Sequence, residues 1–103
     1  MVDLVQRLHV TPEQIADFCR RHSIVRLSLF GSVVRGDFRP DSDVDVLVKF
    51  DDAAQLTLLD LVHIRDKLAA LLARPVDLIE EGTIENPFRK KSIARDQQVV
   101  YAA

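Results

Sequence analysis

The sequence predicts an α+β fold of two layers, in which a small mixed β-sheet carries helices on one of its faces. Two observations lead to this prediction. Segments with helically spaced apolar residues are interspersed with short β-branched segments along the chain. The 103 residues also fit one compact domain of about 100 residues and leave no room for a second. We therefore expect residues 1–103 to form a single domain with one modest core.

The N-terminal part is expected to contain two helices and a strand. Residues 2–8 have the apolar spacing of a short helix. A second helix is marked more clearly by Thr-Pro-Glu-Gln at residues 11–14, which combines an N-cap, a first-turn proline and a capping-box glutamine. This helix is expected to end near His22. Residues 24–30 are apolar and β-branched at their start, which indicates a strand.

A turn and a second strand follow. Gly31 and Ser32 come directly after the first strand, and residues 37–42 have the Asp, Pro and Ser content of a turn. The next strand is expected over residues 43–50, where three alternating valines face the helices and Asp43 and Asp45 point to the open face. Two charges at this place are unusual unless something binds there.

The C-terminal half is expected to contain two helices and two strands. Residues 54–73 form the longest predicted helix, which the Arg-Pro pair at residues 74–75 ends. Residues 76–80 are predicted as a strand and residues 97–101 as a last edge strand. Between them, Asn-Pro at residues 86–87 begins a short basic helix.

Composition and charge argue against several classes of protein. The 16 acidic and 14 basic residues give a net charge of −2 and a pI near 5.9, which disfavours direct nucleic-acid binding through a broad basic surface. The longest apolar run, residues 68–73, is far too short to span a membrane, and the N-terminus lacks a signal-peptide pattern. Cys19 has no partner for an internal disulfide. We therefore expect a cytoplasmic protein that binds no membrane, and a small phosphate site remains compatible with this charge.

Asp43 and Asp45 are candidate ligands for divalent cations. Two residues apart on a strand, their Cα atoms lie roughly 6.5–7 Å apart and their side chains project in the same direction. Oxygen-only ligands suit Mg²⁺ or Mn²⁺, and the histidines and the cysteine lack the spacing of a zinc site. The alternative is that these carboxylates are turn and edge residues that happen to alternate. Asp41, in a Pro-Asp-Ser turn, fits that alternative, whereas Asp45 inside a valine-rich run fits it poorly.

Gly31 and Ser32 are candidate phosphate ligands. A glycine after a strand lets backbone amides approach an anion, and a serine hydroxyl adds a donor. If residues 32–35 form a helical turn, the free N–H groups of that turn would point at the same anion and Arg35 would add positive charge. Taken by itself, this pair of residues is more typical of an ordinary turn than of a phosphate site.

The two halves together resemble the signature of the DNA polymerase β-like nucleotidyltransferase superfamily. Gly31–Ser32 are followed by ten residues and then by Asp43-Val44-Asp45, with Arg35-Gly36 and Ser42 between the halves. The stretch GSVVRGDFRPDSDVDVLVKF resembles the smallest branch of that superfamily, the minimal nucleotidyltransferases of bacteria and archaea. The resemblance covers almost the full chain, and it implies the polymerase β-like nucleotidyltransferase fold.

This resemblance implies roles for the motif residues. Gly31 and Ser32, with Arg35, would hold the triphosphate of a nucleotide. Asp43 and Asp45 would bind two Mg²⁺ ions and act in catalysis.

The family also needs a third carboxylate on a neighbouring strand. Asp77 is the natural candidate, because Val76 and Leu78 alternate with it toward the core and Asp77 would then share the open face with the aspartate pair. It could bind metal or act as a general base. Glu80 and Glu81 remain alternatives for this position.

The resemblance further implies an activity and a partner. A nucleoside monophosphate, AMP from ATP, would be transferred to a hydroxyl while pyrophosphate leaves. Minimal nucleotidyltransferases are commonly paired with HEPN-type toxins, and some transfer AMP to a toxin tyrosine, so an antitoxin is the leading role. A binding module that neutralises the toxin by occlusion is the alternative. Transfer to a small molecule such as an aminoglycoside ranks lower, because no second domain is expected to close over such a substrate.

Two surface features could serve a partner. The longest helix carries a second apolar set, Leu58, Leu59 and Val62, which either packs within the domain or faces a partner. The basic residues 89–91 with Arg95 could contact an acidic partner or a nucleotide, although a solvated helix face is the default interpretation.

Overall fold

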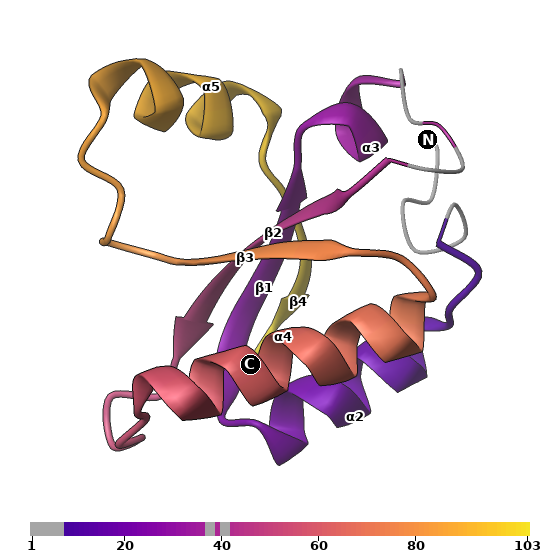
Figure 1. Cartoon of the computed structure of the whole chain (residues 1–103), viewed down its shortest axis with the longest axis vertical. Helices are drawn as coiled ribbons and strands as arrows, with labels where there is room; N and C mark the ends of the chain where they lie inside the picture. The colour runs from indigo at the N-terminus through magenta and orange to yellow at the C-terminus, as the bar shows by residue number, and fades with distance from the viewer. Residues whose placement is uncertain (1–7, 37–38, 40–41) are drawn as a thin grey trace.

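The computed structural model, which describes residues 8–36, 39 and 42–103, contains a four-stranded mixed sheet with helices against it (Figure 1). The strand order is β3-β2-β1-β4, with β1 antiparallel to both neighbours and β2 parallel to β3. This confirms the predicted α+β class. The elements in chain order are α2 (Pro12–Arg21), β1 (Ile24–Phe30), α3 (Ser32–Arg35), β2 (Val44–Phe50), α4 (Leu58–Leu72), β3 (Val76–Glu80), α5 (Pro87–Asp96) and β4 (Gln98–Ala102).

The start of α2 is the capping box that the sequence predicts. The Thr11 hydroxyl accepts from the Gln14 amide at 3.1 Å, and the Gln14 side chain accepts from the Thr11 amide at 2.8 Å. His22 forms the C-cap, as expected. The helix predicted over residues 2–8 and most of the turn predicted over residues 37–42 lie outside the described residues.

The longest helix, α4, begins later than the predicted residue 54. Thr57 is its N-cap, because the Thr57 hydroxyl accepts from the Asp60 amide and the Asp60 carboxylate accepts from the Thr57 amide. This second capping box fixes the start at Leu58. The helix ends at Leu72, one residue before Ala73 in the left-handed conformation.

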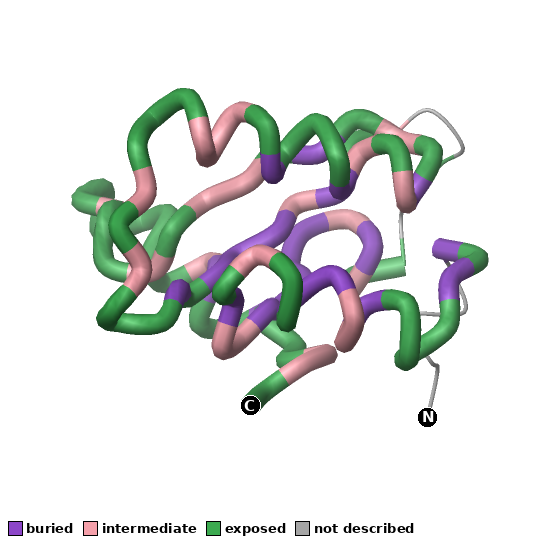
Figure 2. The backbone as a smooth tube through the Cα atoms, turned by 90° about the horizontal axis from the view of Figure 1, so that it is seen from below, coloured by how far each residue is buried: buried purple, intermediate pink, exposed green. Residues whose placement is uncertain are grey.

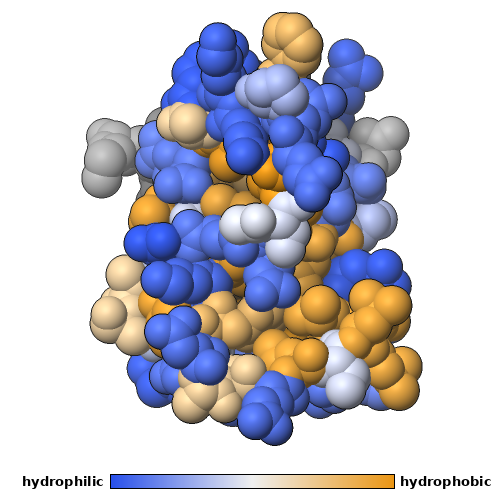
Figure 3. Space-filling view, turned by 90° about the vertical axis from the view of Figure 1, so that its left-hand side faces the viewer, coloured by the Kyte–Doolittle hydropathy of each residue, from blue (hydrophilic) through white to orange (hydrophobic). Residues whose placement is uncertain are grey.

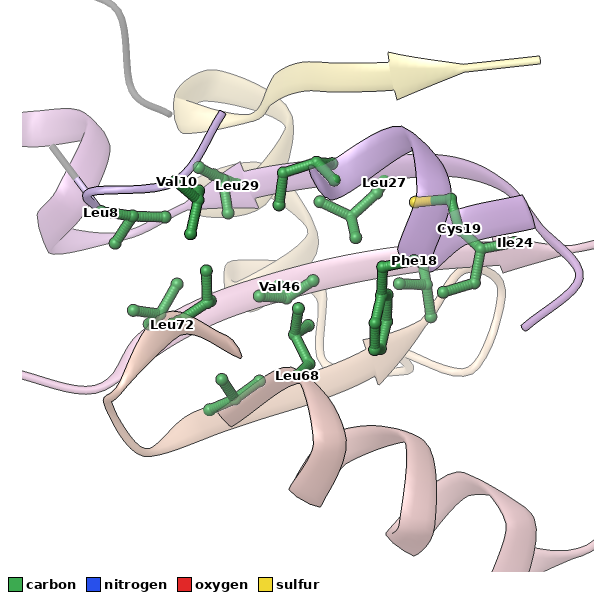
Figure 4. Packing of buried hydrophobic residues seen from close by; sticks show 14 of the residues in the cluster. Leu8, Val10, Phe18, Cys19, Ile24, Leu27, Leu29, Val46, Leu68 and Leu72 are labelled. Carbon is green, nitrogen blue, oxygen red and sulfur yellow. The ribbon is translucent and has the colours of Figure 1, made fainter. Parts of the chain in front are cut away.

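The main core lies between one face of the sheet and the two long helices. Val44, Val46 and Val48 of β2 are fully buried there, as the alternation predicts. Phe18 of α2 and Leu68 of α4 belong to the same cluster and lie near Val46 in Figure 4. Buried positions run along the central strands and the inward sides of these helices (Figure 2). This packing forms the predicted layer of helices against one face of the sheet.

The expectation that helices cover only one face of the sheet is corrected by α5. Ile93 of α5 packs against Phe30 and Leu47, which point away from the main core, so α5 lies on the opposite face from α2 and α4 (Figure 1). The physical reason is Leu47, which shares the face of Asp45 and is apolar. An apolar side chain at this position is stabilised by burial, and α5 supplies the cover.

The second apolar set of α4 divides between the two predicted alternatives. Leu58 and Leu59 are 78% and 62% exposed, so this apolar pair does not pack within the domain, whereas Val62 is half-buried.

Within the described residues, no helix is both long enough and apolar enough to cross a lipid bilayer.

Candidate active site

The sheet brings two of the predicted carboxylates side by side. Asp45 of β2 and Asp77 of β3 are direct partners in the parallel register, on the face that carries α5. Asp43 lies one residue before β2 and is exposed, whereas Asp45 is half-buried. Asp43, Asp45 and Asp77 therefore lie at the same end of the sheet, although Asp77 is far from the other two in sequence.

The alternatives to Asp77 lie elsewhere along β3. Glu80 is opposite Val48, three positions beyond the Asp45–Asp77 pair, and is exposed. Glu81 is engaged by Arg26, whose guanidinium donates to both carboxylate oxygens at 2.8 and 2.9 Å. Register therefore favours Asp77 as the third carboxylate.

Gly31 joins the glycine–serine motif to the carboxylates. It is the N-cap of α3, with φ 78° and ψ −148°, a conformation that is essentially restricted to glycine. A Cβ at Gly31 would lie 2.1 Å from Oδ2 of Asp45, well inside van der Waals contact. The close approach of the Asp45 carboxylate to this backbone explains why a glycine stands at the first position of the motif.

The amides of the α3 turn are partly used within the turn itself. The amides of Val34 and Arg35 both donate to the Gly31 carbonyl, at 3.1 and 3.0 Å, and the Gly36 amide donates to the Ser32 carbonyl at 3.0 Å. Two of the four amides of α3, those of Val34 and Arg35, are therefore used within the turn. Ser32, at the first position of the helix, is half-buried and directly follows Gly31, the residue that the Asp45 carboxylate approaches.

Arg35 points to α5. Its guanidinium donates to Asp96 at 3.0 Å, and Asp96, 8% exposed, also accepts from Arg95 at 3.0 Å. The hydrogen bond from Arg95, together with that from Arg35, lowers the pKa of Asp96 below its usual value. Asp96 could not be identified from the sequence, because nothing in its local pattern indicates a partner 61 residues away.

Asp77 also has a basic partner on α5. Nη2 of Arg89 lies 3.2 Å from Oδ2 of Asp77, and about half of each side chain is exposed. From the sequence, Arg89 belongs to a basic run that could contact an acidic partner or a nucleotide, with a solvated helix face as the default interpretation. The Asn-Pro pair at residues 86–87 is the local pattern that bears on Arg89. It fixes where α5 begins and therefore on which side of the first turn Arg89 lies.

The electrostatics of Asp45 indicate a site with excess negative charge. Burial raises the pKa of Asp45 above its usual value, and repulsion from Asp77 and, less, from Asp43 adds to the rise. Arg89 and then Arg35 oppose it. A cation bound among these carboxylates would relieve the repulsion.

The donor set fits Mg²⁺ in its chemistry, because all three candidate ligands are hard carboxylate oxygens. In the part of the chain that the structure describes, no group of three or more His, Cys, Asp or Glu side chains is gathered as metal ligands. Asp77 is instead turned to Arg89. Binding of Mg²⁺ by all three carboxylates would therefore require their side chains to converge further.

Comparison with known families and proteins yields consistent matches. The nucleotidyltransferase domain family matches residues 12–100. Protein adenylyltransferase MntA of Thermococcus cleftensis is 35% identical over 81 residues, covering 79% of this chain and 77% of the relative. A candidate protein adenylyltransferase of Methanocaldococcus jannaschii is 32% identical over 94 residues, covering 84% of this chain and 94% of the relative.

Solved structures agree with these matches. A candidate minimal nucleotidyltransferase has a TM-score of 0.71 at 36% identity and covers 94% of this chain and 95% of its own. A toxin–antitoxin structure with AMP-PNP has a TM-score of 0.73 at 21% identity, covering 91% and 75%. A tri-AMPylated HEPN toxin of Shewanella oneidensis in complex with an MNT antitoxin has a TM-score of 0.64 at 19% identity, covering 89% and 70%. The two complexes show likeness of fold.

Proposed function

This chain belongs to the nucleotidyltransferase domain family, and from that premise we propose that it transfers AMP from ATP to a hydroxyl group of a partner protein. The observation that carries the proposal is the pairing of Asp45 with Asp77 directly beside the Gly31 turn. Charged carboxylates in this arrangement cost stability through repulsion, which a purely structural role does not explain.

The reaction assigns a task to each part of the site. The acceptor oxygen attacks the α-phosphorus, an oxygen–phosphorus bond forms, and the bond from the α-phosphorus to the bridging oxygen breaks, so that pyrophosphate leaves. Asp77 takes the proton of the acceptor hydroxyl. Gly31 and Ser32 hold the triphosphate, and Arg35, tied to Asp96, adds positive charge at the edge of this turn.

We assign two Mg²⁺ ions to Asp43, Asp45 and Asp77. When bound, such ions supply charge neutralisation for the phosphates and lower the pKa of the attacking hydroxyl. The raised pKa of Asp45 supports this assignment, because burial and then repulsion from Asp77 make its ionised carboxylate costly, and a bound cation would offset that cost.

The proposed acceptor is a tyrosine of a HEPN-type toxin, which makes this chain an antitoxin. Two findings support the proposal. The relative of Thermococcus cleftensis is named a protein adenylyltransferase, and an AMPylated HEPN toxin is the partner of a chain with this fold.

The test is the intact mass of a HEPN-type partner purified after co-expression with this chain. We expect the partner mass to rise by whole AMP units with the wild type, and to stay unchanged with Asp43→Ala/Asp45→Ala. Asp66→Ala is the matched control, because Asp66 is an exposed carboxylate of α4 paired with Arg65, remote from the site. An unmodified partner in all cases, or modification that survives the double substitution, contradicts the proposal.

A second candidate function is neutralisation of the toxin by occlusion alone. It is favoured by Leu58 and Leu59, which are exposed where α4 begins. Figure 3 also shows a hydrophobic area on the lower part of the side of the molecule that it draws. On this alternative, Leu58→Asp abolishes neutralisation whereas Asp43→Ala/Asp45→Ala does not. Val99→Asp is the control, since Val99 is half-exposed on β4 at the opposite edge of the sheet.

A further inference from the structure

The first turn of α5 fixes Arg89 over the carboxylates. Asn86 is the N-cap of the helix, and its side-chain oxygen accepts from the amides of Phe88 and Arg89 at 2.9 and 3.3 Å. Pro87 at the first helical position restricts the backbone further. The backbone of Arg89 is therefore held in one conformation before its side chain makes any contact.

The rest of α5 is tied to the same face of the sheet. Ile93 is buried against Phe30 and Leu47, and Asp96 at the last turn accepts from Arg35. A helix anchored in its middle and at its end leaves its first turn a defined position above β3. The contact of Arg89 with Asp77 follows from this placement, at 3.2 Å between Nη2 and Oδ2.

Arg89 acts on more than one carboxylate. Besides its contact with Asp77, it is the strongest of the positive charges that lower the pKa of Asp45. Its neighbour Lys90 carries the same charge on the same helix but makes no ion pair with a described carboxylate. The interaction with the carboxylates therefore depends on the position of the Arg89 guanidinium and not only on the positive charge of the basic run.

We propose that Arg89 is the resident counter-ion of the carboxylate site, which a divalent cation displaces from Asp77 when it binds. This inference rests on the proposed function, because it takes Asp77 as a metal ligand. The guanidinium of Arg89, held at 3.2 Å from Oδ2 of Asp77, competes with a metal ion for the negative charge and the orientation of that carboxylate, so the ion pair lowers the metal affinity. Because the pair is half-exposed and therefore weak, it yields to a divalent cation, and we expect its effect to be about three- to fivefold.

The consequence is a site that stays folded and partly neutralised without metal. Arg89 offsets the repulsion between Asp45 and Asp77 in the metal-free protein and raises the metal concentration that is needed for loading. Arg89 acts on the metal through Asp77 and is therefore a positioning residue, whose effect is measured directly as a change in metal affinity.

The test is a titration of the full chain with Mn²⁺ in the absence of nucleotide, with free Mn²⁺ measured by electron paramagnetic resonance. Arg89→Gln is expected to bind Mn²⁺ about three- to fivefold more tightly than the wild type. Lys90→Gln removes the same charge one residue away and is expected to change the affinity less than twofold. Combined with Asp77→Asn, the Arg89→Gln substitution is expected to have a smaller effect than in the wild type, because only the charge of Arg89 near Asp45 then remains to be removed.

Two results overturn the inference and are distinguishable. If the wild type binds Mn²⁺ and Arg89→Gln matches Lys90→Gln, Arg89 is no counter-ion of Asp77, while the proposed metal site stands. If none of these proteins binds Mn²⁺, the assignment of the metal to these carboxylates fails, and the inference fails with it. Thermal melting of each variant checks that the fold is kept.

Discussion

At the scale of single residues, Gly31 and Asp45 depend on each other. The carboxylate of Asp45 occupies the space that any side chain at position 31 would need, and the backbone of Gly31 has a positive φ of 78°. Each residue thus explains the other: the glycine admits the carboxylate, and the carboxylate reaches the turn because nothing stands between them.

Gly31→Ala is expected to destabilise the fold more than Gly82→Ala. Both glycines have a positive φ, which costs an alanine about 1–3 kcal/mol, but only at Gly31 does the new Cβ meet another atom within 4 Å. The overlap with Asp45 adds about 1–3 kcal/mol. Urea unfolding of both variants measures the difference. Adding Asp45→Ala to Gly31→Ala should recover most of the excess, and equal losses at Gly31 and Gly82 would contradict the close approach.

Asp45→Asn is expected to raise stability at neutral pH. Because the pKa of Asp45 is raised by burial and by Asp77, the protonated form is favoured in the fold, and the ionised form becomes costly as the pH rises above the usual value of 3.8. The melting temperature of the variant should therefore exceed that of the wild type by a few degrees near pH 7, and the two should converge near pH 3. Asp66→Asn should show no such gain. A wild type that is the more stable protein at pH 7 would refute this reasoning.

At the scale of elements, local patterns were sufficient for the strands and insufficient for α5. Strand β1 and strand β3 have the predicted bounds, and α2 has its predicted capping box, because alternation and capping involve residues close in sequence. The side of the sheet on which α5 lies depends on Ile93 meeting Leu47, which are far apart in the chain. The same holds for the site. Its aspartates follow from a short motif and a strand register, whereas the contacts of Arg35 and Arg89 depend on where α5 lies.

Ile93→Ala is expected to loosen α5 and leave the main core intact. Ile93 is the one residue of α5 in the second apolar cluster of the described chain, so its truncation removes the central anchor of the helix. The loss is about 2–3 kcal/mol, at the lower end for buried isoleucine, because the cluster is small. Hydrogen exchange should show faster exchange for the amides of α5 while those of α2 and α4 keep their protection. Uniformly faster exchange across all helices would show instead that α5 unfolds together with the rest.

At the scale of the whole molecule, the main core and the candidate site occupy opposite faces of one sheet. The core packs α2 and α4 against the sheet, and the site lies on the face of α5, where β1 ends and β2 and β3 begin (Figure 1). The sheet separates the two, so substitutions in one need not disturb the other. Stability and nucleotide binding should accordingly respond to different residues.

Leu68→Ala tests this separation, with Leu58→Ala as its control on the same helix. Leu68 is 1% exposed in the main core, so its truncation should cost about 2–5 kcal/mol, whereas Leu58, 78% exposed, should cost less than about 0.5 kcal/mol. A domain of this size has a stability of about 5–15 kcal/mol, so the comparison is made at low temperature, where circular dichroism checks that Leu68→Ala is folded. Under those conditions its affinity for ATP with Mg²⁺, measured by calorimetry, should equal that of the wild type. Asp45→Ala should instead remain folded without loss of stability and no longer bind ATP. A folded Leu68→Ala protein that no longer binds ATP would show that the core reaches through the sheet to the site.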